Sequence, residues 1–275
     1  VNLDDYLLAI VPSEMPASWQ AEALKSQAIA ARTYAVFHMW LARKVHKRLW
    51  DVDPTTWYQS YRGALVENQR VTPQVEATAG QILSYNSKII EAFFSSNSGG
   101  MTCSISECFG YSDRPYIVAQ KDVDGVRAKP GGTWKTAVTP EGLAARLEKL
   151  QAEGKLKISD LIPQYQGPKD LMGLEIHEAG PAGRIKTLNL LLANGAEVNL
   201  SPAVSREMRW QFGMKTNYYE VDSPVPGATQ AVTGYGLGHG VGLSQWGAQV
   251  MANQGAVYAD ILKFYYKGVN ITPLW

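Results

Sequence analysis

Hydrophobic and polar positions alternate with two different periods along the chain, and together they predict a mixed α+β fold. A long stretch from Ser18 to His46 repeats apolar residues at three- and four-residue spacing, which is typical of a helix capped by Ser18. One face of this helix is formed by Leu24, Ala28, Ala31, Ala35 and His38. Because most of that face is alanine, another element can approach closely, so we expect a long helix buried at the centre of the fold.

Strand patterns follow in two blocks. Residues 81–85 and 88–94 read as two strands joined by a turn at Asn86-Ser87. Residues 174–178, 184–192 and 197–200 read as an antiparallel meander, with a hairpin turn at Asn194-Gly195. Shorter helices are predicted over residues 71–80, 139–154, 201–210 and 258–266, whereas 51–63 and 111–138 read as irregular or turn-rich.

The elements predict a single mixed α+β domain over residues 1–275, with a long buried N-terminal helix and antiparallel strands. Within it, residues 139–169 read as an exposed helical insertion that could bind a partner. The chain has 275 residues and is 45% hydrophobic, which is enough for a sizeable core.

Composition excludes several classes of function. The net charge of +1 gives no basic footprint for nucleic acid. No apolar run reaches membrane-spanning length, so no membrane span is expected. The first residues read directly as folded protein, as expected of a trimmed chain, so the lack of a signal peptide says nothing about compartment.

The richest local signal is the stretch from Gly234 to Ala248, which holds six glycines and His239. Ser244 is placed to cap a following helix that Gly255 ends. Glycine allows left-handed backbone and close approach, so one interpretation is a ligand-binding loop ahead of a helix N-terminus. The other interpretation is a tight loop whose histidine satisfies a buried backbone group.

Glu14 is the second candidate for chemistry. Pro12 and Pro16 bracket it, which predicts a restricted turn just ahead of the long helix. A carboxylate there could simply be favoured by the helix dipole. It could instead act as a general acid if an apolar surround raises its pKa.

The only cysteines are Cys103 and Cys108, whose spacing allows either a disulfide or two free thiols. A lone pair with no nearby histidine is a weak signal for zinc. The polar loop from Ser95 to Thr102 follows a predicted strand and is either a surface turn or a ligand contact.

Three separated stretches resemble the SpoIID/LytB family of bacterial cell-wall proteins, which comprises sporulation protein D transglycosylases and amidase enhancers. The matching stretches are Val11–Pro16 continuing into Ala21–Tyr34, Ser96–Thr102 after a strand, and Gly236–Ala248 running on to Tyr265–Gly268.

The resemblance implies an extracytoplasmic protein that acts on peptidoglycan glycan strands, without a cofactor. It implies a lytic transglycosylase that cleaves MurNAc–GlcNAc bonds, with Glu14 as the general acid and base. Residues implied to bind the sugar are His239, Ser244 and Gln245, with Ser96, Ser98, Tyr34 and Gly240 as further candidates. The alternative is a non-catalytic enhancer whose partner is a cell-wall amidase.

Two details of the chain qualify the resemblance. Some family members bind zinc through His and Cys near the serine-glycine loop, but this chain has Ser95, Asn97 and Met101 there, so no metal is expected. Export to an oxidising compartment would favour a disulfide between Cys103 and Cys108.

Overall fold

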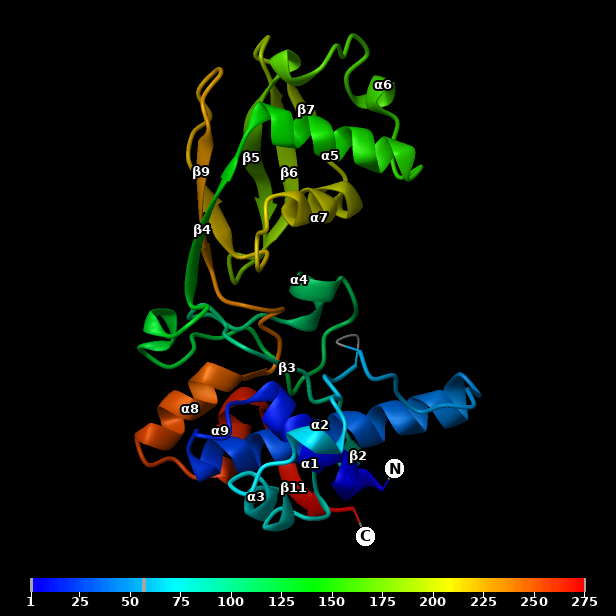
Figure 1. Cartoon of the computed structure of the whole chain (residues 1–275), viewed down its shortest axis with the longest axis vertical. Coiled ribbons are helices and arrows are strands. Elements are labelled where there is room, and N and C mark those ends of the chain that lie inside the picture. The colour runs from blue at the N-terminus through cyan, green and yellow to red at the C-terminus, as the bar shows by residue number, and fades with distance from the viewer. Residues whose placement is uncertain (1, 56–57, 275) are drawn as a thin grey trace.

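The protein is described here by a computed structural model covering residues 2–55 and 58–274. Helices and several small antiparallel sheets confirm the predicted mixed α+β fold. Two hydrophobic cores lie one above the other in Figure 1, and the chain enters the upper one along β4 (Thr133–Val138) and returns along β9 (Gln230–Tyr235), while α4 (Ile105–Phe109) packs on the lower core. We call these the first core, running from Leu7 to Ile117 with Ala182 and Val241 to Val269, and the second core, running from Trp134 to Val232.

The first core is built around α2 (Ala21–Trp40), the predicted central helix. Its alanine face is buried, with Ala28, Ala30 and Ala31 fully inaccessible to solvent. Small side chains let neighbouring helices and a strand pack closely on several sides. Those neighbours are α1 (Leu3–Glu14), α3 (Thr72–Glu76), α8 (Gln245–Asn253), α9 (Tyr258–Tyr265) and the sheet of β11 (Asn270–Pro273), β1 (Gln81–Tyr85) and β2 (Lys88–Ile89).

The second core packs helices on an antiparallel meander. The meander is β5 (Leu171–Ala179), β6 (Ile185–Leu192) and β7 (Glu197–Asn199), as the sequence predicts. A second sheet joins β4 (Thr133–Val138), β9 (Gln230–Tyr235) and β8 (Tyr219–Val221). The covering helices are α5 (Pro140–Ala152), α6 (Ile158–Leu161) and α7 (Pro202–Gln211).

Residues 139–169 are partly buried rather than an exposed segment. Leu143, Leu147 and Leu150 on α5 are fully inaccessible and belong to the second core. Thr139 caps α5 by accepting a hydrogen bond from the backbone N–H of Gly142 at 3.1 Å. Whether the segment is an insertion relative to the shortest family members stays a prediction.

The N-terminal prediction was wrong in two respects. Residues Leu3–Glu14 form helix α1, with Pro12 inside it, so Glu14 ends a helix instead of lying in a turn. Proline is tolerated here because it removes only one donor in the last turns, while Leu7, Ile10 and Val11 bury the helix face. The long helix begins at Ala21 with Gln20 as N-cap, not Ser18, and passes into a π-helical turn at Leu41–Val45.

The remaining predictions mostly hold, with some strands missed. The turn at Asn86-Ser87 forms with both residues at positive φ, and helix α8 starts after Ser244 as expected. β4 lies in the stretch that reads as irregular, and the second predicted strand ends early, at Ile89. Residues 56–57 of the aromatic segment 51–63 lie outside the described residues.

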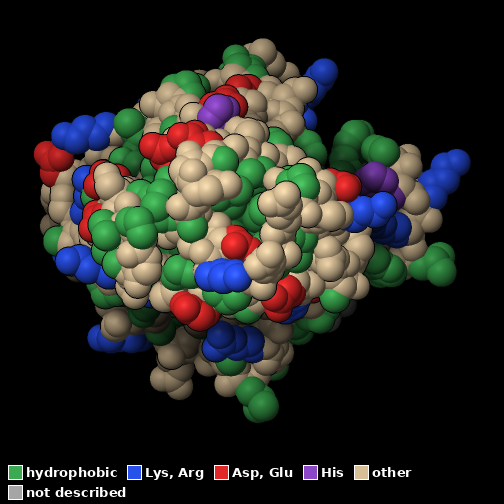
Figure 2. Space-filling model, turned by 90° about the horizontal axis from the view of Figure 1, so that it is seen from above, with side chains coloured by type: hydrophobic (Ala, Val, Ile, Leu, Met, Phe, Trp, Pro, Cys, Tyr) green, Lys and Arg blue, Asp and Glu red, His purple; other side chains and the backbone are tan. Residues whose placement is uncertain are grey.

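The face seen in Figure 2, above the second core, carries acidic and basic side chains interspersed rather than in a single-sign patch. This distribution agrees with the net charge of +1. No helix in the described part of the chain is long and apolar enough to cross a membrane.

Candidate functional site

Glu14 is held at the C-terminal end of α1 by contacts from two distant segments. The backbone N–H of Ser60 donates to its Oε1 at 2.8 Å. The side chain of Gln245, the first residue of α8, also hydrogen-bonds its carboxyl group. The site therefore joins residues far apart in the sequence around one half-buried carboxyl group.

The surroundings of Glu14 favour its protonated form. Burial raises the pKa of the carboxyl group above its ordinary value, and the hydrogen bonds from Ser60 and Gln245 and the guanidinium of Arg62 lower it in part. Glu14 also lies where the dipole of α1 is negative, which disfavours a carboxylate. The prediction that a helix dipole favours the Glu14 carboxylate is therefore wrong, because Glu14 lies at the C-terminal end of α1, where the dipole is negative.

Gln245 is placed by the cap of its own helix. Ser244 accepts a hydrogen bond from the backbone N–H of Gly247 at 3.2 Å, as the sequence predicts for an N-cap. The same hydroxyl oxygen accepts from the backbone N–H of Ser98 at 3.4 Å. The start of α8 is thus tied to the serine-glycine loop.

A buried carboxylate fixes that loop from the other side. Asp122 accepts from the hydroxyl of Ser98 at 2.5 Å and from the hydroxyl of Tyr265 at 2.6 Å. Ser98 and Ser244 are 0% and 1% exposed. Since both hydroxyls are buried and engaged inside the protein, we assign Ser98 and Ser244 to holding the site together and not to sugar contact.

The glycines of the motif let two protein segments approach each other. A Cβ on Gly99 would lie 2.6 Å from the backbone nitrogen of Gly236, and one on Gly236 would lie 2.7 Å from the carbonyl oxygen of Asn97. Both glycines also have positive φ, at 73° and 87°. Their backbone freedom therefore serves contact within the protein, as the tight-loop interpretation requires.

His239 is partly exposed, and its ring is held by contacts within this loop. Its Nδ1 accepts from the backbone N–H of Val241 at 3.0 Å, and the ring also hydrogen-bonds the backbone of Phe94. The ring packs against Phe93 and Phe109. Burial lowers the pKa of His239 to about 4, so the imidazole is neutral at pH 7. The structure supports the interpretation that this histidine satisfies buried backbone groups.

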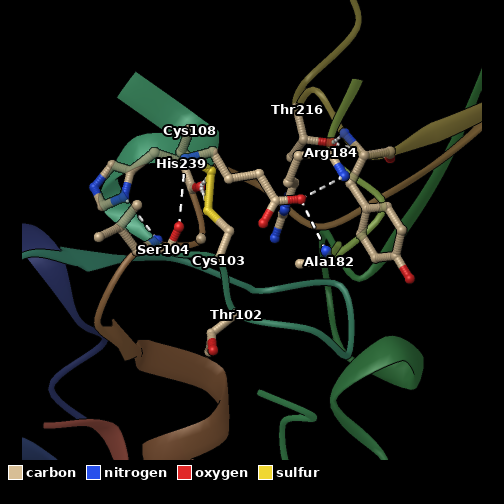
Figure 3. The surroundings of a disulfide bond; sticks show 12 residues. Thr102, Cys103, Ser104, Cys108, Ala182, Arg184, Thr216 and His239 are labelled. Carbon is tan, nitrogen blue, oxygen red and sulfur yellow. Dashed lines mark hydrogen bonds between the residues drawn. A yellow bond between two sulfur atoms is a disulfide. The ribbon is translucent and has the colours of Figure 1, made fainter. Parts of the chain in front are cut away.

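A disulfide lies beside the carbonyl group of His239 (Figure 3). Cys103 and Cys108 are bonded, with their Cα atoms 6.5 Å apart. Their sulfur atoms lie 3.2 and 3.1 Å from the carbonyl oxygen of His239, a contact without a hydrogen because disulfide sulfurs carry none. The bond joins the strand-like entry of α4 to that helix and supports the glycine-rich loop from one side.

Arg184 enters the same region from the second core (Figure 3). It is 0% exposed and donates from Nη2 to the carbonyl oxygens of Ser98 and Met101 at 3.0 and 2.7 Å. Burial lowers the pKa of its guanidinium to about 10. A Cβ on Gly240 would lie 2.3 Å from Nη2, so a glycine at this position makes room for the guanidinium.

Glu107 on α4 also connects the two cores, and we call its contacts together with those of Arg184 the joint between the cores. Its Oε1 accepts from the backbone N–H groups of Ala182 and Arg184 at 2.9 and 3.2 Å. Gly240 is buried against Arg184 and belongs to this joint, not to an open surface.

The structure brings together only part of the predicted site. Glu14 and Gln245 meet, and Ser96 is partly exposed and accepts at its carbonyl oxygen from Trp246. Tyr34 is 8% exposed and packs against His38. Within the described interactions His239 contacts neither Glu14 nor Gln245, so the prediction of one shared cleft for all three stays a prediction.

Sequence reasoning missed three buried residues that organise the site. They are Gln27 on α2, which accepts from Gln245, the buried carboxylate Asp122, and the buried cation Arg184. Gln27 lies inside the Ala21–Tyr34 motif, so the motif could have identified it. Nothing local to Asp122 or Arg184 distinguishes them from surface residues. Within residues 2–55 and 58–274, no group of three or more His, Cys, Asp or Glu side chains is arranged to hold a metal ion.

Comparison with known proteins gives a consistent family. Residues 1–85 match the SpoIID model, described as stage II sporulation protein. Stage II sporulation protein D of Bacillus subtilis is 32% identical, over 99% of this chain and 75% of its own length. An uncharacterized protein of Brachyspira hyodysenteriae is 35% identical, over 98% of this chain and 67% of its own length.

The amidase enhancer of Bacillus subtilis is 31% identical over 97% of this chain, but the chain spans only 40% of that relative's length. The matches to these relatives and the motif stretches agree. The chain belongs to the SpoIID family, as the resemblance predicts.

Proposed function

We propose that this protein is a peptidoglycan lytic transglycosylase in which Glu14 is the general acid and base. The observation that carries the proposal is a half-buried carboxyl group with a raised pKa, held by two hydrogen-bond donors. Among the described residues the charged group that acts on it is a cation, Arg62, and not a second carboxylate. Hydrolases of glycosidic bonds normally use a pair of carboxyl groups, so catalysis by Glu14 without a second carboxyl group would require a substrate that supplies its own nucleophile.

The reaction would proceed without consuming water. Protonated Glu14 donates its proton to the oxygen that links MurNAc C1 to GlcNAc, and the C1–O bond breaks. The 6-hydroxyl of the same MurNAc then bonds to C1, and the Glu14 carboxylate takes up the hydroxyl proton. The products are a GlcNAc end with a free hydroxyl and a 1,6-anhydro-MurNAc end, and Glu14 is again protonated.

The raised pKa of Glu14 gives this mechanism a pH dependence. The first step needs the protonated acid, so cleavage should fall as pH rises through the pKa of Glu14. The free energy of unfolding depends on pH in the same direction. A carboxyl group whose pKa is higher in the folded state stabilises the fold at low pH, and that contribution is lost as pH rises through the folded pKa.

Sugar positioning in this proposal falls mainly to groups at the rim of Glu14. Gln245, which is 4% exposed, binds the carboxyl group directly. Trp246 follows Gln245 in the chain, and its backbone N–H donates to the carbonyl oxygen of Ser96; both Trp246 and Ser96 are partly exposed. Tyr34 and His239 would act indirectly, by holding the elements that carry these groups. Correct orientation of the bond can contribute several kcal/mol to catalysis.

The substrate in the proposal is a glycan strand of the cell wall, stripped of stem peptides, and the compartment is extracytoplasmic. The relatives named stage II sporulation protein D and amidase enhancer support a role at the cell wall, and the denuded strand and the compartment are part of the proposal. A cell-wall amidase is the proposed partner.

The second candidate is a glycan-binding enhancer that does not cleave. The 31% identity to an amidase enhancer favours it, and the chain covers 40% of that protein. In this case Glu14 would contribute to binding only.

Incubation of the purified chain with denuded glycan strands, followed by mass spectrometry, tests the two candidates. A transglycosylase releases fragments with 1,6-anhydro-MurNAc ends in the absence of any other protein. An enhancer releases none, yet increases the rate at which an added amidase frees stem peptides from intact peptidoglycan. Intact strands and an unchanged amidase rate would reject both.

A further inference from the structure

Gln27 is a polar side chain in the most buried part of the fold. It lies in the first half of α2 and is 0% exposed. Its Oε1 accepts a hydrogen bond from Nε2 of Gln245 at 3.3 Å, across the packed interface of α2 and α8. Gln245 is itself 4% exposed.

The amide of Gln245 therefore has acceptors on two sides. Its NH₂ group carries two hydrogens, one available to Gln27 and one to the carboxyl group of Glu14. If the amide rotated by half a turn, its oxygen would face the acceptor oxygens of Gln27 and of the Glu14 carboxylate, with no hydrogen in either contact. Because the side-chain oxygen of Gln27 is an acceptor, it favours the orientation of the Gln245 amide in which the NH₂ group also faces Glu14.

The position of Gln27 leaves its own amide nitrogen without a hydrogen bond within the described part of the chain. Its own Nε2 is buried and has no hydrogen-bond partner among the described residues. A buried amide N–H without a partner destabilises the folded state, and an apolar side chain of similar size would avoid the loss. The requirement for an acceptor at Gln245 explains why an amide occupies this place.

We propose that Gln27 is a positioning residue whose side-chain oxygen fixes the amide of Gln245 so that its NH₂ group faces the carboxyl group of Glu14. The inference deepens the proposed function, since it assigns to α2 the orientation of the acid and base. Gln27 itself would not contact the sugar, because it is fully buried.

The first test measures Glu14 directly by NMR titration of its side-chain carboxyl carbon. Loss of the fixed donor in Gln27→Met should raise the pKa of Glu14 by about one unit, equivalent to a tenfold change in the proton equilibrium. Arg62, Ser60 and Tyr6, the other groups that act on Glu14 or feel its charge, are left in place. Gln249→Met, on the same helix as Gln245 but bonded to Gln20 and Asn253, is the matched control and should leave Glu14 unchanged.

A double-mutant cycle identifies the route. Gln245→Met should produce the same shift, and Gln27→Met combined with Gln245→Met should add nothing further, because Gln27 acts through Gln245. Gln27→Leu replaces the methionine variant if that variant does not fold. An unshifted Glu14 in the Gln27 variants, an equal shift in Gln249→Met, or additive shifts would overturn the assignment.

Cleavage of denuded strands gives the second readout. Gln27→Met should lower kcat by about tenfold while KM stays within about twofold, and the alkaline limb of the pH profile should move to higher pH. Failure of the wild type to form anhydro ends would reject the proposed function, yet the titration would still decide the role of Gln27.

Discussion

The two cores of this chain differ in where their buried polar groups lie relative to the candidate site. In the second core, Gln230 bonds both backbone groups of Leu174, Ser205 bonds Leu188 and Leu200, and Arg146 bonds the side chain of Glu207, all away from Glu14. In the first core some polar side chains also bond backbone, as Thr33 does with Leu83, but others bond one another across elements around the candidate site. Examples are Gln27 with Gln245 and Asp122 with Ser98 and Tyr265.

The difference separates scaffold from site. Backbone-directed bonds stabilise a sheet and its covering helices, whereas side-chain networks fix the orientation of particular functional groups. The networks of the first core lead to Glu14 and to the start of α8. The second core reaches this region through Arg184 and through the backbone that Glu107 holds. We therefore expect changes in the first core to affect chemistry and changes in the second core to affect stability.

The largest effect is expected from Glu14→Gln. The amide keeps the shape but cannot deliver a proton, so cleavage of denuded strands should fall by about 10²-fold or more. Binding of the same strands, measured by pull-down or calorimetry, should hardly change. Undiminished cleavage by this variant would remove Glu14 from the mechanism and leave the fold as described.

Leu147→Ala tests the second core. The side chain is fully buried on α5, so its truncation should lower the free energy of unfolding by about 3 kcal/mol, measured by denaturant titration. The rate of glycan cleavage, measured well below the melting temperature, should stay at the wild-type value. Lys149→Ala on the exposed face of the same helix is the control and should change stability by less than about 0.5 kcal/mol. A loss of cleavage in folded Leu147→Ala would place part of the chemistry in the second core.

A smaller effect is expected from removal of the disulfide. Replacing Cys103 and Cys108 by serine opens a loop of only a few residues, so the expected loss of stability is about 2 kcal/mol. Intact mass without reductant should show two hydrogens fewer than the reduced chain. Two free thiols in protein recovered from an oxidising compartment would contradict the assignment, and so would an unchanged unfolding midpoint after reduction.

Local chemistry made part of this structure predictable. The alanine face identified α2, Ser244 identified the cap of α8, and the Asn86-Ser87 turn was visible in the sequence. The motif identified Glu14 as a candidate, but the sequence did not predict that Glu14 ends a helix. Pro12 normally indicates a helix break, and here the burial of one face of α1 stabilises the helix despite the proline.

What the sequence did not reveal depends on long-range contacts. β4 pairs with β9 about a hundred residues later, Thr133 opposite Tyr235, so β4 has no partner nearby in the sequence to indicate it. The role of Gly240 becomes visible only when the guanidinium of Arg184 is seen to occupy the space of its missing side chain. In the same way, the alanine pattern of α2 gives no sign that Gln27 faces Gln245.

The central claim is that Glu14 works with the substrate's own hydroxyl group and not with water. Cleavage of denuded strands in water enriched in ¹⁸O tests it directly, with the new MurNAc ends weighed by mass spectrometry. The account predicts anhydro ends that contain no ¹⁸O and weigh one water less than a hydrolysed end. MurNAc ends that carry ¹⁸O at C1 would show that water is the nucleophile and would contradict the account.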